Sequence, residues 1–192
     1  MTAVDDALRT RGVHLEQITL GWNVVGIAVL AWSALAARSI ALAAFGLDSL
    51  IEIGASTVVL WELRGTGEER RQRAQRLIAV AFIAVAAYVA IQSTVGLALD
   101  HRAKHSAAGI AWTAITAVAM FALAAAKTST GRALRNPVLE SEGRVTFVDG
   151  LLTTAVLVGL VLNAALDAWW ADPAAAYIIV LYALRGARAN VR

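Results

Sequence analysis

The sequence contains no cysteine and few charged residues, and both absences narrow what the protein can be. Without cysteine, neither a disulfide framework nor a thiolate metal site can form. Charged residues make up 16% of the 192 positions and hydrophobic residues 59%, which is too little charge for the surface of a soluble domain of this length. Segments of about 20 residues nearly free of charge are long enough to cross a bilayer. We therefore expect an integral membrane protein.

Signatures of other functional classes are also missing. We find no Ser-His-Asp arrangement, no glycine-rich phosphate loop and no HExxH motif, so the sequence does not predict an enzyme. The net charge of +3 does not indicate nucleic acid as a partner, because the basic residues lie between apolar segments, where membrane topology accounts for them. Asp5 and Asp6 precede any apolar run, unlike the start of a cleaved signal peptide.

Six apolar segments have the length and composition of membrane-spanning helices. They are rich in Ala, Val, Leu and Gly, and they are too long for barrel strands of about ten residues. The predicted fold is all-α, with a six-helix membrane domain over 18–185, a cytoplasmic segment 1–17, a short cytoplasmic tail 186–192 and no C-terminal soluble domain. The spans are expected at 18–36, 40–61, 77–99, 106–126, 145–166 and 171–185.

The lysines and arginines predict the orientation of these spans. Most of the 17 lie before the first span, between spans 2 and 3, between spans 4 and 5, or after span 6; the exceptions are Arg38, Arg102 and Lys104. Short loops rich in Lys and Arg stay in the cytoplasm, so both termini are expected inside, at the plasma (inner) membrane. On this interpretation Lys127 belongs to the cytoplasmic connection between spans 4 and 5, and residues 64–76 form a solvated cytoplasmic connection between spans 2 and 3.

Two carboxylates interrupt the second span. Asp48 and Glu52, in the stretch FGLDSLIEIGAS, are four residues apart, so a helix places them on one face. An acid at the centre of a span costs about 2.5–3.5 kcal/mol on insertion scales, and two like charges on one face repel. A proton on one carboxylate or a cation between them would stabilise the pair. The alternative is a static pair, hydrogen-bonded to other helices or lining a watery crevice.

The fifth span adds further acids. Asp149 lies within its apolar run, and Glu142 lies two helical turns earlier on the same face, either as a further ligand or as an interfacial carboxylate. Oxygen-rich clusters suit divalent cations, and the same carboxylates take up protons when the metal leaves. The sequence therefore predicts a cation transporter in a lipid bilayer, with the candidate metal ligands Asp48, Glu52, Asp149 and Glu142.

Three other polar residues carry weaker signals. Asn23 in the first span can offer an amide oxygen to a cation or a hydrogen bond to another helix. His101 and His105 have the i, i+4 spacing that can hold a metal on a helix face. They lie in the predicted outer loop, however, and two histidines alone make a weak site, so the sequence leaves their role open.

Three stretches of the chain resemble the cation diffusion facilitator family. AARSIALAAFGLDSLIEIGAS resembles its second transmembrane helix, and RVTFVDGLLTTAVLVGLVLN and WWADPAAAYIIVLYALRGAR resemble its fifth and sixth. The resemblance implies a homodimeric exporter of divalent metal, driven by inward proton flow, with no resident cofactor. It matches Asp48 and Glu52 to the acidic ligands of the second helix and Asp149 to the acid of the fifth.

The chain also departs from the family pattern. Zinc transporters of the family usually have His where this chain has Val145, and Glu52 replaces the commoner Asp. The family's cytoplasmic metal-binding domain is expected to be absent. Without imidazole the site is all-oxygen, which favours manganese, magnesium or ferrous iron over zinc. Alternatively, Glu142 swings down to replace the missing ligand, or transport has been lost. A non-transporting membrane partner or regulator that keeps the transporter fold is the alternative function.

Overall fold

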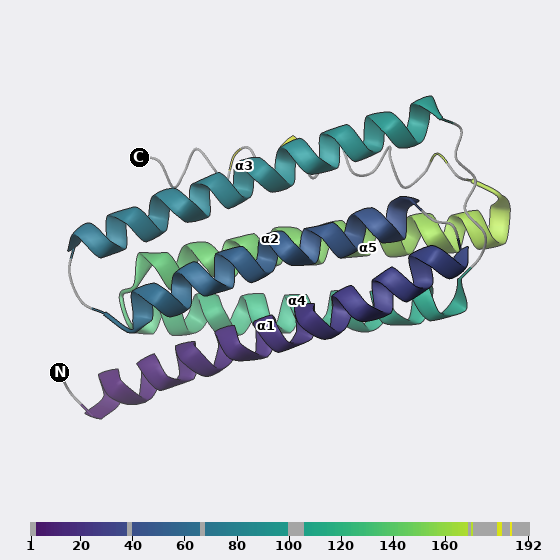
Figure 1. Ribbon diagram of the computed structural model, residues 1–192. Coiled ribbons are helices and arrows are strands. Elements are labelled where there is room, and N and C mark those ends of the chain that lie inside the picture. The colour runs from purple at the N-terminus through teal and green to yellow at the C-terminus, as the bar shows by residue number, and fades with distance from the viewer. Residues whose placement is uncertain are drawn as a thin grey trace.

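The computed structural model describes residues 3–37, 40–65, 68–99 and 106–168, together with Trp170, Val180, Leu181 and Arg185. These described residues form long α-helices and no strand, as the sequence predicts. The helices run up and down along a common axis, and the N-terminus lies at the same end as the α2–α3 and α4–α5 connections (Figure 1). Their bounds are α1 Ala3–Ala37, α2 Ile40–Leu63, α3 Glu68–Ala98, α4 Ala107–Ala133 and α5 Pro137–Leu166.

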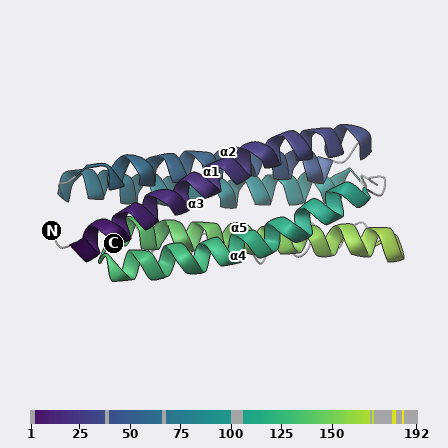
Figure 2. The ribbon, with the colours of Figure 1, turned by 90° about the horizontal axis from the view of Figure 1, so that it is seen from below.

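Four helices contain segments that are long and apolar enough to cross a membrane: Asp5–Ala36, Glu69–Ala98, Ala107–Ala133 and Pro137–Leu166. The α2 helix lies among them and runs beside α1 in the opposite direction (Figure 2). Leu35 is 80% exposed, Trp32 74% and Val118 72%, as expected of side chains that face lipid.

Two sequence predictions fall largely outside the described residues. Of the predicted sixth span, 171–185, only Val180, Leu181 and Arg185 are described, and Val180 packs against the apolar core. The basic residues expected in the outer loops, Arg38, Arg102 and Lys104, are not among the described residues. Six spans and cytoplasmic termini therefore stay predictions.

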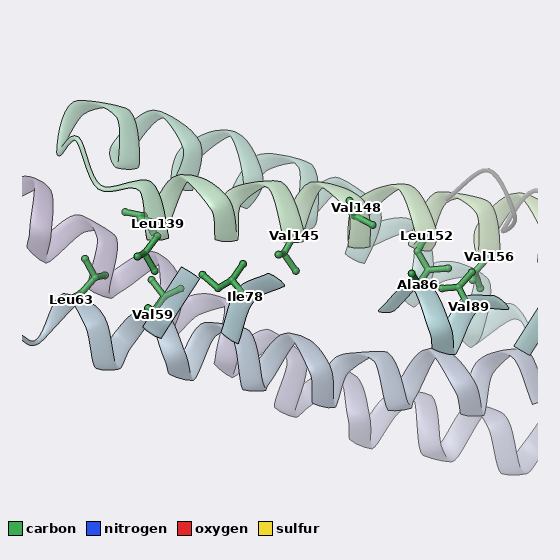
Figure 3. Close-up of a cluster of buried hydrophobic side chains, with 12 residues drawn as sticks. Val59, Leu63, Ile78, Ala86, Val89, Leu139, Val145, Val148, Leu152 and Val156 are labelled. Carbon is green, nitrogen blue, oxygen red and sulfur yellow. The ribbon is translucent and has the colours of Figure 1, made fainter. Parts of the chain in front are cut away.

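The α2 and α5 helices occupy the centre of the bundle. The α2 helix packs against α1, α3 and α5, and α5 packs against α2, α3 and α4. An apolar cluster joins α2, α3 and α5 (Figure 3), and its buried members are Val59, Leu63, Ala74, Ile78, Ala86, Val89, Val138, Leu139, Val145, Val148, Leu152 and Val156. This cluster holds α2 and α5 side by side, which positions the polar residues on their other faces.

The helices extend past the predicted apolar spans at the end of the bundle that holds the N-terminus. The sequence prediction ended each span near its first charged residue, whereas charged residues with high helix propensity continue a helix beyond the apolar stretch. At the start of α5, the Asn136 side chain accepts hydrogen bonds from the backbone N–H groups of Val138 and Leu139, and Pro137 occupies the first turn. The observed limits at this end are Ala3, Leu63, Glu68, Ala133 and Pro137.

Glycine allows α4 and α5 to approach closely. A β-carbon at Gly143 would lie 2.5 Å from Thr128 Oγ1 and 2.9 Å from the Thr128 amide nitrogen. A β-carbon at Gly131 would lie 2.6 Å from the backbone nitrogen of Glu140. Only residues without a β-carbon fit at this spacing, so these glycines set the distance between the two helices.

We expect Gly143→Ala to force α4 away from α5 and to lower the free energy of unfolding by about 1–3 kcal/mol, as overpacking in a tight interface does. Gly21→Ala is the matched control, because nothing lies within 4 Å of the β-carbon it adds. Unfolding of the detergent-solubilised proteins by heat or denaturant measures the difference. Equal stability of the two variants would contradict the close approach of α4 and α5.

Candidate functional site

Three of the predicted site residues meet between α2 and α5. Asp48 and Glu52 on α2 are each 3% exposed, and Asp149 on α5 is 7% exposed. The carboxyl groups of Asp48 and Asp149 lie close enough to interact with each other, and Glu52 interacts electrostatically with both. Ionised carboxylates only accept hydrogen bonds, so two neighbouring carboxyls can bond to each other only when one of them holds a proton. The structure therefore brings two acids from different helices together at a position that suits a proton.

Glu52 has a partner of its own on α5. Its Oε1 atom accepts a hydrogen bond from Thr146 Oγ1 at 2.9 Å, and both side chains are buried. Thr146 lies three residues before Asp149, so one face of α5 presents a hydroxyl to Glu52 and a carboxyl to Asp48. The spacing of the acids on α2 is thus matched by donors and acceptors on α5.

Glu142 is held in a different contact. Its Oε1 atom accepts hydrogen bonds from Lys127 Nζ at 2.6 Å and from Ser56 Oγ at 3.3 Å. Glu142 is 0% exposed, so its carboxylate is buried between helices and does not face the surroundings of the protein. A buried carboxylate at this position requires a positive partner, and the partner comes from α4.

Lys127 does not lie in a connection between helices, and its sequence assignment to a cytoplasmic loop is wrong. The α4 helix continues to Ala133, and Lys127 is 0% exposed. Its ammonium lies 3.1 Å from Glu16 Oε2 and 3.1 Å from Thr146 Oγ1, in addition to the contact with Glu142. A lysine near the end of an apolar run can either extend toward water or turn inward to pair, and here it pairs.

Sequence analysis did not single out Glu16, which lies on α1 and is 0% exposed. Glu16, Thr19 and Asn23 are all buried and recur at i, i+3 and i+7, which places them on one face of the helix. A polar stripe at this spacing, entering an apolar span, is the signal that could have indicated an inward-facing acid. It was missed because Glu16 precedes the predicted start of the first span, residue 18.

Asn23 and two tryptophans lie near Asp149. Asn23 Nδ2 donates a hydrogen bond to the backbone oxygen of Thr19 at 3.0 Å. Asn23, Asp149, Trp22 and Trp112 surround a narrow gap with no room for a water molecule, and the two tryptophan rings are stacked with centroids 5.2 Å apart. The amide nitrogen of Asn23 is therefore used within α1, and side chains of α1 and α4 lie close to Asp149.

Within the described ranges, no three acidic or histidine side chains are arranged to hold a metal ion together. His101 and His105 are not among the described residues. Val145, the position of the family's usual histidine, is 2% exposed and belongs to the apolar cluster (Figure 3). A cation bound by Asp48, Glu52 and Asp149 would therefore require rotation of their side chains and loss of any proton that they hold.

Comparison with known proteins identifies the family. The sequence profile of the cation efflux transmembrane domain matches residues 17–192. The chain belongs to the cation efflux family. This cation efflux protein is a multi-pass integral membrane protein with the fold of a cation transporter, and members of its family are transporters rather than enzymes. No curated protein matches the chain.

The family match covers most of the polar network but not all of it. Asp48, Glu52, Lys127 and Asp149 fall within the matched range, whereas Glu16 lies one residue before its start. In this cation efflux protein the acids of α2 and α5 thus connect, through Thr146 and Lys127, to an acid outside the matched range.

We expect Thr146→Val to lower the free energy of unfolding of the cation efflux protein by about 1–3 kcal/mol, because it leaves a buried Glu52 oxygen without its donor. Thr153→Val is the matched control, since Thr153 is buried on the same helix and its Oγ1 has no hydrogen-bond partner among the described residues. Parallel unfolding measurements compare the two. A Thr146→Val variant as stable as the control would contradict the link between Glu52 and Lys127.

Proposed function

We propose that this cation efflux protein exports a divalent metal cation in exchange for protons, and that Asp48, Glu52 and Asp149 bind the cation. The meeting of the buried Asp48 and Asp149 carboxyls is the observation that carries the proposal, because two neighbouring buried acids favour a proton on one of them when no cation is bound. A divalent cation needs ionised oxygens, so its arrival expels this proton, and reprotonation expels the cation. Competition for the same oxygens couples the two flows.

The ligand chemistry favours hard cations. The three acids offer only oxygen atoms, and Val145 places an aliphatic side chain where an imidazole would add nitrogen. Oxygen ligands suit manganese, magnesium and ferrous iron, whereas zinc favours sites with nitrogen or sulfur. We therefore expect manganese, iron or magnesium to be transported in preference to zinc. Glu142 is not assigned to this position, because Lys127 holds its carboxylate at 2.6 Å.

The direction of export follows from the expected orientation and the proton gradient. Short connections rich in Lys and Arg stay in the cytoplasm, so we expect both termini inside, and we expect the protein in the plasma (inner) membrane. The working unit is a homodimer, as the family resemblance implies, and small residues on membrane-embedded faces suit the close approach of two copies. The inward proton gradient then drives the cation outward.

Flux into sealed liposomes tests the proposed function. Purified protein is reconstituted with a pH-sensitive dye inside, and manganese, ferrous iron, cobalt, zinc, cadmium and magnesium are added outside in turn. We expect uptake of the preferred cation to raise the internal pH, because protons leave as the cation enters, and Asp149→Ala to remove both signals. Folded protein that moves none of these ions would overturn the proposal and favour the regulatory alternative.

A further inference from the structure

The ammonium of Lys127 is surrounded by oxygen atoms from two other helices. Its Nζ atom lies 2.6 Å from Glu142 Oε1 and 3.1 Å from Thr146 Oγ1, both on α5, and 3.1 Å from Glu16 Oε2 on α1. An ammonium has three hydrogens and no acceptor. It donates hydrogen bonds to Glu142 Oε1 and Thr146 Oγ1, and it forms an ion pair with Glu16 Oε2. The oxygens around Nζ therefore form a cation-binding position, and the ammonium of Lys127 occupies it.

The ammonium of Lys127 does not balance the whole negative charge of the carboxylates around it. Glu16 and Glu142 are two buried carboxylates facing a single ammonium, and both are 0% exposed. Neither oxygen of the Glu16 carboxylate is in hydrogen-bond geometry with a partner among the described residues, although Oε2 forms an ion pair with Lys127 and Ser56 interacts with the carboxylate. A buried carboxylate oxygen without a donor is costly, so this position has more negative charge and more acceptor capacity than one ammonium uses.

The position adjoins the proposed transport site. Thr146 Oγ1 lies 3.1 Å from Lys127 Nζ and 2.9 Å from Glu52 Oε1, so one hydroxyl touches both. Because the ammonium only donates, the Thr146 hydroxyl accepts from it and directs its own hydrogen at a carboxylate. A second divalent cation bound here would be close to the first, so the negative charge of the surrounding carboxylates would have to offset the repulsion between the two ions.

We propose that Glu16 and Glu142, with the hydroxyls of Ser56 and Thr146, form a second cation-binding position. The Lys127 ammonium fills this position, so the protein binds only one transported cation at a time. Two carboxylates and two hydroxyls form an all-oxygen set of the kind that divalent cations accept. The inference rests on the proposed function for the first cation, held by Asp48, Glu52 and Asp149. It adds a second position and its resident occupant.

Binding of manganese alone tests this inference. Wild-type protein, Lys127→Ala, Lys127→Met and Lys127→Ala/Glu142→Gln are placed in lipid nanodiscs and equilibrated with Mn²⁺. We expect one ion per chain for wild type and two for Lys127→Ala, whose shortened side chain leaves room for an ion. Lys127→Met removes the charge but keeps the volume, so it should bind one. The double variant loses a ligand of the second position and should also bind one.

Electron paramagnetic resonance adds a readout that a purely structural role of Lys127 would not change. Two neighbouring Mn²⁺ ions in Lys127→Ala should broaden each other's spectrum, and the broadening should disappear in the double variant. A single unbroadened ion in Lys127→Ala would overturn the inference. If Lys127→Ala does not fold, Mn²⁺ should restore folding by replacing the lost charge. Failure of Mn²⁺ to do so, when Lys127→Ala/Glu16→Gln/Glu142→Gln folds without it, would also overturn the inference.

The experiment separates the two proposals. Wild-type protein that binds no Mn²⁺, or that binds it equally well as Asp149→Asn, contradicts the proposed function. If wild-type protein binds one ion that depends on Asp149, and Lys127→Ala also binds only one ion, the results contradict only the second cation-binding position.

Discussion

Asp149→Asn is expected to abolish cation transport while the helices stay folded. The amide has nearly the shape of the carboxyl and can still donate a hydrogen bond to Asp48, so the contact between α5 and α2 is preserved. It has no negative charge and does not exchange a proton at physiological pH. Loss of one charged partner in a buried site costs about 3–5 kcal/mol, which corresponds to a fall in cation affinity of about 100-fold or more.

Flux and equilibrium binding in the same preparation measure this effect. Asp167→Asn is the matched control, because Asp167 ends the same helix, is exposed, and has a positive φ of 57° that Asn adopts readily. The control should transport and bind like wild type. Asp149→Asn with normal flux and normal affinity would mean that the cation does not depend on the carboxyl of α5.

Lys127→Met is expected to lower the free energy of unfolding by about 3–5 kcal/mol, because it leaves the buried carboxylates of Glu16 and Glu142 without their positive partner. Replacement of all three charged side chains, Lys127, Glu16 and Glu142, is expected to cost less stability. In Lys127→Met/Glu16→Gln/Glu142→Gln no buried charge is left unpaired at this position, so most of the lost stability should return. The single substitution should therefore be worse than the triple one.

Unfolding in detergent, followed by helical circular dichroism, compares these variants. Arg132→Met is the control on the same helix, since Arg132 pairs with Glu140 at 3.4 Å but is 70% exposed. An exposed pair contributes about 0–1 kcal/mol, so the control should lose little. A triple variant that is no more stable than Lys127→Met would show that the cost arises from packing rather than from unpaired charge.

The sequence alone was sufficient to predict the helices and the burial of the acids at the centre of the bundle. Long apolar runs with no competing strand pattern predict membrane helices, since hydrocarbon leaves the backbone no other way to satisfy its polar groups. Asp48 and Glu52 interrupt such a run at helical spacing, and Asp149 interrupts another, so their burial follows from the cost of leaving an acid in lipid. The resemblance then paired the second helix with the fifth, and the two helices are in contact.

Only the tertiary structure decided what the charges at the ends of the spans do. Lys127 and Glu142 lie where an apolar run gives way to charged residues, and a residue there can extend to water or turn inward at similar cost. Whether such a side chain extends to water or turns inward depends on the rotation and depth of its helix. Packing sets both, for example through the close approach of Gly143 to Thr128. Glu16 pairs with Lys127 across more than a hundred residues of sequence. No local pattern contains that contact, because it exists only once α1 packs against α4.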